Sequence, residues 1–275
     1  MRAAGLRARK SLAQHFLVDR RILSRIVAAA ELSPDETVVE VGAGLGVLTR
    51  ELAAGARSVV AVEVDEKLCL HLRQTLQSHS NVAVVCADVL SLSPADLLEK
   101  AGLPAGRYAV VANLPYYIAS PVLRHFLEAR LPPTRLVVML QREVAESMAA
   151  APGRMSLVGA AVQLYGRPRL LFSVPPTAFY PPPKVRSAVL RIDVAQGPTV
   201  EVPSPAAFFE VVRAGFSAPR KQLRNSLSQG LGVQPVEAEA LLKAAGVDPH
   251  RRPQQLSMEE WAALCRARAA AASTS

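Results

Sequence analysis

The chain has 275 residues, half of them apolar, and 32 Lys and Arg residues against 23 acidic ones give a formal net charge of +9. The length allows one large domain with a smaller appendage, and charged residues interrupt every apolar run before the roughly 18 residues of a membrane span. The positive charge favours an anionic partner, most simply nucleic acid.

The first 25 residues are strongly basic, with seven Lys or Arg residues and a single acid, Asp19. An Arg-rich start can mark a transit peptide, but the chemically suggestive run Gln14-His15-Phe16-Leu17 begins too early to leave room for a removable leader. We therefore expect residues 1–13 to form a basic arm that contacts phosphates. Asp19 is the expected N-cap of a helix over 20–32, because its carboxylate can accept from the free N–H groups of the first turn.

Strand-like and helix-like segments alternate as far as residue 150, which predicts βαβ units and a buried, mostly parallel sheet. Three cysteines, Cys69, Cys86 and Cys265, show no C-x-x-C spacing, so we expect reduced thiols and neither a disulfide framework nor a zinc site. The expected strands are 37–41, 58–63, 82–86, 108–112 and 135–140, and the helices that follow them are 45–54, 66–77, 94–101, 119–129 and 142–150.

A glycine-rich turn follows the first of these strands, with Gly42, Gly44 and Gly46 ahead of the helix. Glycines let the backbone approach a ligand closely, and the helix N-terminus behind them offers free N–H groups. A phosphate-binding loop needs Gly-Lys-Ser/Thr, which does not follow here, and a dinucleotide fingerprint places its third glycine one residue later. The G-x-G-x-G spacing is instead typical of enzymes that use S-adenosylmethionine (AdoMet).

Acidic residues end the next two strands. Glu63 is placed to accept from both hydroxyls of a ribose, although it could also be a solvated acid or a partner of Arg57. Asp65 could compete for this role, but it is the better N-cap for the next helix. Asp88 could accept from the amine of an adenine, although such an acid more often caps a turn. Because ligands of open α/β sheets bind at the carboxyl ends of the strands, we expect these acids to share one site with the glycine turn.

Residues 113–117, Asn-Leu-Pro-Tyr-Tyr, come directly after the fourth strand. The amide oxygen of Asn113 can accept from an exocyclic amine, Pro115 sets the backbone direction, and the Tyr116 ring can stack on a flat base. The alternative is an ordinary turn in which both tyrosines are packing residues. Tyr117 is the weaker stacking candidate, and we expect it to pack in the core.

The chain changes character from about residue 163. Two longer strands, 163–172 and 185–192, are expected to form an antiparallel pair at the sheet edge, separated by the proline-rich turn 180–183. A linker follows at 196–205, and we expect domains 1–195 and 204–271. The expected helices of the second domain are 205–216, 219–229, 235–245 and 257–270.

Four segments resemble the ribosomal RNA adenine dimethyltransferase family, and its bacterial small-subunit (16S) branch most of all. They are Gln14–Asp19, Asn113–Pro121, Phe179–Val185 and Arg220–Ser226, within a resemblance that spans about residues 10–265. The resemblance implies an α/β fold with a Rossmann-like AdoMet-dependent methyltransferase sheet and a small all-helical C-terminal domain. It also implies N6,N6-dimethylation of two adjacent adenines in the 3′-terminal hairpin of small-subunit RNA, without a metal.

Roles for individual residues follow from this resemblance. Asn113 and the carbonyl of Leu114 would accept the two hydrogens of adenine N6 at the turn set by Pro115. Tyr116 would stack on one face of the base and Phe179 on the other. His15 departs from the family, which usually has Asn there. The residues expected to hold AdoMet are His15, Leu17, Gly42, Gly44, Glu63, Asp88 and Asn113.

The resemblance also implies the partners. Arg220, Lys221 and Arg224 are expected to contact the RNA backbone, unless they belong to an ordinary solvated helix face. Pro219 shortens the Arg-Arg-Lys cluster that the family carries at this point. We expect a cytoplasmic monomer that acts on the immature 30S subunit during ribosome biogenesis.

Three alternatives stay open. A large-subunit (23S) adenine methyltransferase of the resistance type is the nearest, and the segments Phe179–Val185 and Arg220–Asn225 argue against it. A DNA adenine methyltransferase shares the Asn-x-Pro-Tyr turn but normally lacks the C-terminal helices. A non-catalytic ribosome-assembly or RNA-binding factor could share the fold, and binding of AdoMet would argue against that reading.

Overall fold

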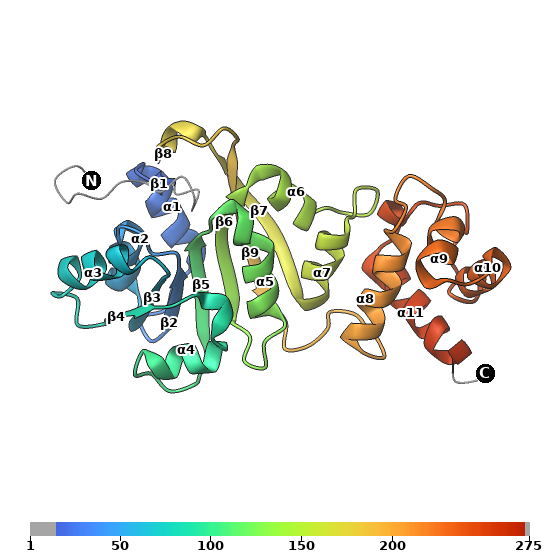
Figure 1. Ribbon diagram of the computed structural model, residues 1–275, viewed down its shortest axis with the longest axis horizontal. Helices are drawn as coiled ribbons and strands as arrows, with labels where there is room; N and C mark the ends of the chain where they lie inside the picture. The colour runs from blue at the N-terminus through green and yellow to red at the C-terminus, as the bar shows by residue number, and fades with distance from the viewer. Residues whose placement is uncertain (1–14, 273–275) are drawn as a thin grey trace. The chain divides into compact units, whose positions relative to one another are not determined.

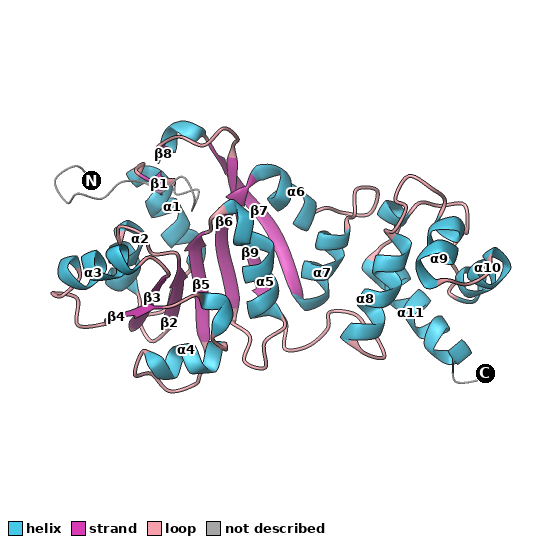
Figure 2. Ribbon diagram, viewed as in Figure 1, coloured by secondary structure: helices cyan, strands magenta, loops and turns pink. Residues whose placement is uncertain are grey.

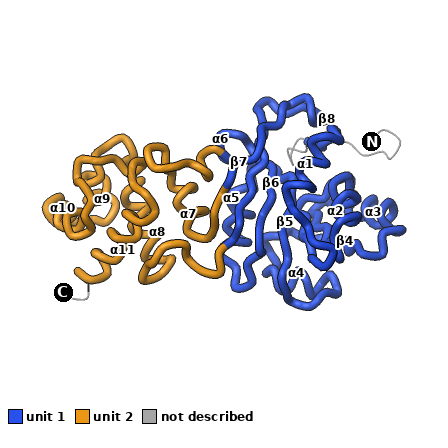
Figure 3. Tube along the Cα trace, turned by 180° about the vertical axis from the view of Figure 1, so that it is seen from behind, with its two compact units in different colours: residues 1–145, 169–194 blue, residues 146–168, 195–275 orange. Residues whose placement is uncertain are grey.

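The computed structural model describes residues 15–272, so the predicted basic arm and Gln14 lie outside the described residues. The chain divides into two compact units, coloured blue and orange in Figure 3. Unit 1 comprises the chain up to residue 145 together with 169–194, and unit 2 comprises 146–168 and 195–275. The predicted domains, 1–195 and 204–271, differ from these units at residues 146–168, which group with the helical part. Those domain boundaries stay a prediction.

Unit 1 is built on a seven-stranded sheet of order β4-β3-β2-β5-β6-β9-β7 (Figures 1 and 2). Strands β2 to β6 pair in parallel, and β9 runs antiparallel to β6 next to the edge strand β7. The predicted α/β class with a mostly parallel sheet is confirmed. The strands are β2 (Thr37–Val41), β3 (Ser58–Glu63), β4 (Val82–Cys86), β5 (Tyr108–Asn113), β6 (Arg135–Gln141), β7 (Gly166–Val174) and β9 (Ser187–Val194).

Helices cover both faces of this sheet, which is why its central strands are apolar on both sides. On one face, Ile26 of α1 and Leu52 of α2 pack in one core with Val111 of β5. On the other face, the ring of Tyr108 lies 6.3 Å from that of Phe126 in α5. The helices of this part are α1 (Arg20–Ala30), α2 (Val47–Gly55), α3 (Glu66–Thr75), α4 (Pro94–Lys100), α5 (Ala119–Leu127) and α6 (Arg142–Met148).

Two of the predicted helix caps are present in the structure. The Asp19 carboxylate accepts from the backbone N–H of Arg21 at 2.8 Å and of Ile22 at 3.3 Å. Asp65 accepts from the backbone N–H of Lys67 at 2.9 Å at the start of α3. Each cap satisfies donors that the first helical turn leaves free. Asp65 is therefore engaged as the predicted cap, and Glu63 stays the candidate acid for a ligand at the end of β3.

A separate two-stranded sheet joins distant parts of the chain. β1 (Phe16–Leu17) pairs antiparallel with β8 (Phe179–Tyr180), so that Leu17 lies opposite Phe179. The backbone N–H of Val18 adds a hydrogen bond of 2.8 Å to the Ala178 carbonyl. This pairing brings the segment that begins at His15 beside the one that carries Phe179.

Unit 2 is helical, and its core is built around Phe208 and Trp261. A strand was expected from residue 163, but Gln163–Tyr165 is the last turn of a helix whose N-cap is Ser156. No helix in the described part of the chain is long and apolar enough to cross a membrane. The helices are α7 (Leu157–Tyr165), α8 (Pro205–Gly215), α9 (Leu223–Leu231), α10 (Pro235–Ala244) and α11 (Met258–Ala272).

The cysteines correct another prediction. A disulfide joins Cys69 of α3 to Cys86 of β4, whereas reduced thiols were expected. Because β3 and β4 are adjacent parallel strands and α3 connects them, residues 17 positions apart meet here with their Cα atoms separated by 5.8 Å. Cys265 is free and buried.

Candidate active site

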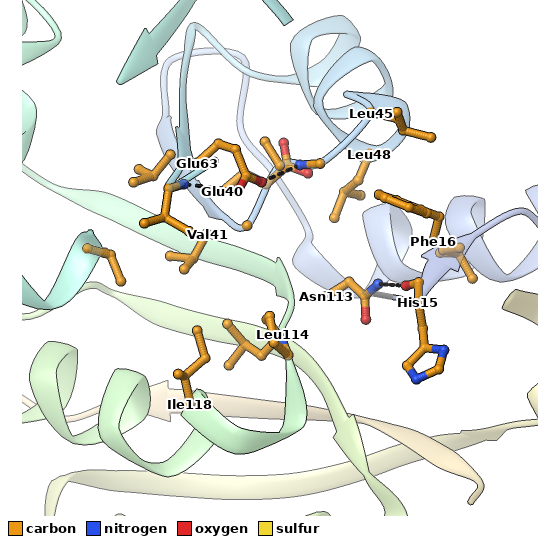
Figure 4. Close-up of a pocket in the computed structure, with 18 of the residues that line it drawn as sticks. His15, Phe16, Glu40, Val41, Leu45, Leu48, Glu63, Asn113, Leu114 and Ile118 are labelled. Carbon is orange, nitrogen blue, oxygen red and sulfur yellow. Dashed lines mark hydrogen bonds between the residues drawn. The ribbon is translucent and has the colours of Figure 1, made fainter. Parts of the chain in front are cut away.

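A cavity of about 290 Å³ lies at the carboxyl ends of β2, β3 and β5 (Figure 4). The structure brings together at this cavity every residue predicted to hold AdoMet and every residue predicted to act on the base. The RNA-binding candidates lie in unit 2 and do not line it. The predicted residues that line the cavity are His15, Leu17, Gly42, Gly44, Glu63, Asp88, Asn113, Leu114, Pro115, Tyr116 and Phe179.

The glycine turn depends on its glycines for a conformational reason. Gly42, Gly44 and Gly46 have φ angles of +72°, +57° and +72°, which residues with a Cβ rarely adopt. A Cβ at Gly44 would also lie 3.3 Å from the ring of Phe16. The turn therefore keeps the backbone exposed to the cavity at the start of α2.

Glu63 holds this turn in place. Its side chain is buried, with Oε2 accepting from the Gly44 N–H at 2.9 Å and Oε1 from the N–H groups of Val64 at 2.9 Å and Asp65 at 3.0 Å. It is thus neither a solvated acid nor a partner of Arg57. Because a carboxylate can accept about four hydrogen bonds, it retains capacity for the hydroxyls of a ligand.

Asp88 caps a turn, which was the alternative to its predicted role as a ligand for adenine. Its Oδ1 accepts from the Leu90 N–H at 3.0 Å and caps the short 3-10 helix η3 (Val89–Ser91). The residue is nonetheless exposed and lines the cavity beside Val89 and Leu90. Capping through one oxygen orients the carboxylate and leaves the second oxygen as a further acceptor.

Glu40 is a cavity residue to which sequence reasoning assigned no role. Its side chain is 2% exposed, and among the described residues Oε2 has no hydrogen-bond partner. Burial raises the pKa of this carboxyl to about 8, and the nearby charge of Glu63 adds to the rise. The signal in the sequence is a lone acid inside the apolar strand Thr-Val-Val-Glu-Val.

The charges around the cavity differ in sign from the net charge of the chain. The carboxylates of Glu63 and Asp88 line it together with Glu40, whose raised pKa favours the neutral form, whereas no Lys or Arg is among its described lining residues. Such a site disfavours a phosphate and suits a ligand with positive charge. AdoMet has a sulfonium and an ammonium group, so its charge fits these donors and acceptors, and apolar residues such as Leu48, Val89 and Ile118 complete the walls.

The amide of Asn113 has a defined orientation. Its Nδ2 donates to the backbone carbonyl of His15 at 3.3 Å, and Oδ1 points away from that contact (Figure 4). The next residue, Leu114, donates its N–H to the carbonyl of Met139 in β6 at 3.0 Å. With the nitrogen engaged, the oxygen of Asn113 is the part of the amide that can accept from a ligand.

Aromatic rings surround this amide. The hydroxyl of Tyr116 hydrogen-bonds with that of Ser187 at 2.7 Å, and burial raises the Tyr116 pKa, with the charge of Glu143 adding to the rise. Phe179 is buried and lines the cavity. Tyr117 corrects the sequence prediction, since it is 56% exposed and does not pack in the core.

His15 connects two of these segments. Its imidazole stacks on the ring of Tyr116, with centroids 6.2 Å apart and planes 29° apart. Its Nδ1 donates to the carbonyl of Pro181 at 2.7 Å. His15 therefore supports Asn113 through its backbone, while its side chain fixes the aromatic wall.

The predicted RNA-binding residues lie between α8 and α9 and at the start of α9. Arg220 and Lys221 are exposed. Arg224 is half-buried and forms an ion pair of 3.1 Å with Glu239. Arg220 and Lys221 are thus the better placed of the three to meet a phosphate.

The parallel sheet, the glycine turn and the polar residues at the ends of β3, β4 and β5 (Glu63, Asp88 and Asn113) define a Rossmann-like AdoMet-dependent methyltransferase. A model of the family described as ribosomal RNA adenine dimethylase matches residues 5–268. The chain belongs to this family, and it is accordingly an AdoMet-dependent rRNA adenine dimethyltransferase.

Individual relatives agree with this assignment. The chain is 49% identical over 260 residues to the ribosomal RNA small subunit methyltransferase A of Dehalococcoides mccartyi, covering 94% of this chain and 88% of that one. It is 43% identical to the protein of the same name from Moorella thermoacetica, covering 97% and 94%. Among solved structures, the 23S rRNA methyltransferase ErmE has a TM-score of 0.73 at 31% identity, covering 92% and 98%. A dimethyladenosine transferase from Plasmodium falciparum has a TM-score of 0.75 at 22% identity, covering 91% and 96%, and it supports the fold alone.

Proposed function

We propose that this enzyme dimethylates N6 of two adjacent adenines in the 3′-terminal hairpin of small-subunit ribosomal RNA. Membership of the family establishes methylation of rRNA adenines. The small subunit is favoured because relatives at 49% and 43% identity bear that name, whereas the 23S enzyme ErmE is 31% identical. The observation that carries the proposal is the amide of Asn113 at an acid-lined cavity: its nitrogen is engaged with the carbonyl of His15, which leaves its oxygen as the acceptor.

The residues at the cavity fit AdoMet, which when bound supplies a methyl group on a positively charged sulfur. Glu63 would accept from the ribose hydroxyls and Asp88 from the adenine amine of the cofactor. Glu40, whose Oε2 has no described partner, is a candidate acceptor for the cofactor's ammonium group. The backbone at Gly42, Gly44 and Leu17 would border the ligand.

The residues around Asn113 would prepare the target nitrogen for attack. The lone pair of adenine N6 is delocalised into the ring, which makes the nitrogen a poor nucleophile. Hydrogen bonds from its two N–H groups to Asn113 Oδ1 and to the Leu114 carbonyl would favour a pyramidal nitrogen with its lone pair directed at the methyl group. The contribution of the protein is then positioning and local electrostatics, without a nucleophilic side chain.

Aromatic stacking would hold the base in this position. Tyr116 would pack on one face and Phe179 on the other, and the hydrogen bond to Ser187 fixes the Tyr116 ring. The target must leave its own stack to enter, as for other enzymes that act on a base. The monomethylated product keeps one N–H group, so a second transfer needs only one of the two acceptors.

The RNA and its particle complete the proposal. Arg220, Lys221 and Arg224 would contact phosphates, which orients the substrate without reading its sequence. We further propose that the enzyme acts as a monomer in the cytoplasm on the immature 30S subunit. The names of the relatives support the small subunit as the target, and the exposed Arg220 and Lys221 support the contacts with phosphates.

Replacement of Asn113 by Ala tests the assignment directly. Methyl transfer from labelled AdoMet to unmethylated 30S subunits should be lost, because N6 loses its oriented acceptor, while thermal unfolding stays close to that of the wild type. Glu63→Ala should instead weaken binding of AdoMet in calorimetry. Mass spectrometry of the 3′-terminal RNA fragment locates the product, and full dimethylation by the Asn113 variant would refute the assignment.

A further inference from the structure

Two aromatic pairs from distant parts of the chain share one arrangement at the cavity. Tyr116, Tyr117 and Phe179 line the cavity, and the second residue of each pair, Tyr117 and Tyr180, is 56% exposed. Among the aromatic side chains of residues 15–272, these two are the exposed ones. In β8 the opposite directions of Phe179 and Tyr180 follow from the alternation of side chains along a strand.

His15 holds the two pairs at the same rim. Its ring stacks on Tyr116, directly before Tyr117, and its Nδ1 donates to the carbonyl of Pro181, directly after Tyr180. Tyr180 also lies opposite Phe16 in the β1–β8 pair, and Phe16 lines the cavity. His15 therefore links the segment that carries Tyr117 to the segment that carries Tyr180 at the cavity.

Exposed cations follow the second pair. Lys184 and Arg186 are exposed, and the segment 179–187 contains no acid. Ser187, the next residue, hydrogen-bonds with Tyr116, and it lies opposite Gln141 at the carboxyl end of β6. That strand end neighbours the end of β5, so Arg186 belongs to the same sheet edge as Asn113. Glu143 is an acid close to Tyr116, so the charge beside this ring is mixed.

We propose that Tyr117 and Tyr180, the tyrosine rim, stack on the nucleotides on either side of the target adenine, with Lys184 and Arg186 meeting their phosphates. The inference rests on the proposed function. A base that leaves its stack exposes one face of each neighbour, and an aromatic ring at the rim can cover that face. Flat rings with polar hydroxyls beside cations match a single-stranded polynucleotide better than an apolar protein surface.

The test uses a synthetic RNA hairpin of the small-subunit 3′ end with 2-aminopurine next to the target adenine. Stacking on a rim tyrosine keeps this nucleotide quenched, so its fluorescence in the complex should rise in Tyr117→Ala or Tyr180→Ala. The KM for the hairpin should increase roughly 5- to 150-fold per ring removed, with kcat little changed. The corresponding Phe variants keep the ring and should behave as the wild type.

Leu70→Ala is the matched control, because Leu70 is 58% exposed on α3 and does not line the cavity. It should leave both fluorescence and KM unchanged. Unchanged fluorescence and KM in both Tyr→Ala variants would overturn the tyrosine rim. An effect seen on 30S particles but not on the free hairpin would also overturn it, because it would assign these rings to a protein contact. In either case the wild type would still methylate 30S subunits, the substrate of the proposed function, so failure of the rim is distinct from failure of the proposed function.

Discussion

The carboxyl of Glu40 lies in an apolar strand at the floor of an acid-lined cavity, so its charge state is set by burial. With a pKa of about 8 in the folded protein against 4.5 normally, Glu40 keeps its proton over a range in which the unfolded chain has lost it. The folded state then holds one more proton than the unfolded state. The free energy of unfolding should therefore fall as pH rises from about 4.5 to 8, by at most about 1.4 kcal/mol per pH unit, and no further above that.

Glu40→Gln removes this titration while keeping the shape of the side chain. Urea unfolding at pH 6 and pH 8 should show a smaller loss of stability in the variant than in the wild type. Other groups titrate equally in both proteins, so the difference between them reports Glu40. An identical pH dependence in the two proteins would mean that Glu40 is already ionised at pH 6.

The residues of this site could be predicted from the sequence where they come directly after an apolar strand. Glu63, Asp88 and Asn113 each follow an apolar run, and parallel strands bring such ends to one edge. Exposure was not predictable in the same way. Tyr117 and Tyr116 are neighbours with the same side chain, and only the short helix that begins there decides which of the two faces the solvent. The burial of Glu40 likewise could not be predicted from its own strand, in which it is the lone acid.

At the scale of the element, the junction between the glycine turn and α2 depends on backbone conformation. Gly46 has a φ of +72°, and a Cβ there would lie 2.8 Å from Cδ2 of Leu72 in α3. Gly46→Ala should therefore destabilise the protein by about 1–2 kcal/mol from the left-handed backbone alone, plus the displacement of Leu72. AdoMet binding should weaken as well, because the turn borders the cavity.

Gly102→Ala isolates the backbone term of this prediction. Gly102 has a φ of +75° and no atom within 4 Å of the added Cβ. Urea unfolding of the two variants compares strain with and without the clash, and calorimetry measures AdoMet binding in both. Equal losses of stability in the two variants would show that Leu72 accommodates the added Cβ at no cost. Unaltered binding of AdoMet would show that the turn does not shape the cavity.

The helices and strands themselves were largely predictable from periodicity. β2, β3 and β4 have the predicted bounds, and the apolar runs of β2 and β3 are buried almost throughout. The strand expected from residue 163 was wrong for residues 163–165, which form the last turn of α7. The run Val-Gln-Leu-Tyr alternates like a strand, and the Ser156 cap that starts the helix lies well before that run. The disulfide between α3 and β4 could not be predicted from periodicity, since it depends on which strands are neighbours.

At the scale of the whole molecule, the net charge of the chain and the charge of the cavity have opposite signs. The chain has a net charge of +9, yet the described lining of the cavity contains acids and no Lys or Arg. Positive charge that attracts RNA is therefore placed outside the cavity, where it does not compete with the positive charge of AdoMet. Binding of the cofactor and binding of RNA should accordingly depend on different residues. The two affinities should also differ in their dependence on salt concentration.

The double variant Arg220→Ala/Lys221→Ala tests this division. RNA affinity should fall, and the slope of log K against log salt concentration should become shallower by about 0.7 for each phosphate that the variant no longer neutralises. AdoMet binding should not change, because neither residue lines the cavity. Lys243→Ala is the control, since Lys243 is exposed but already paired with Glu239 at 2.9 Å, and its removal should leave the slope unaltered. A slope that stays the same in the double variant would place the phosphate-binding residues elsewhere, and the rim cations Lys184 and Arg186 would then be the next residues to replace.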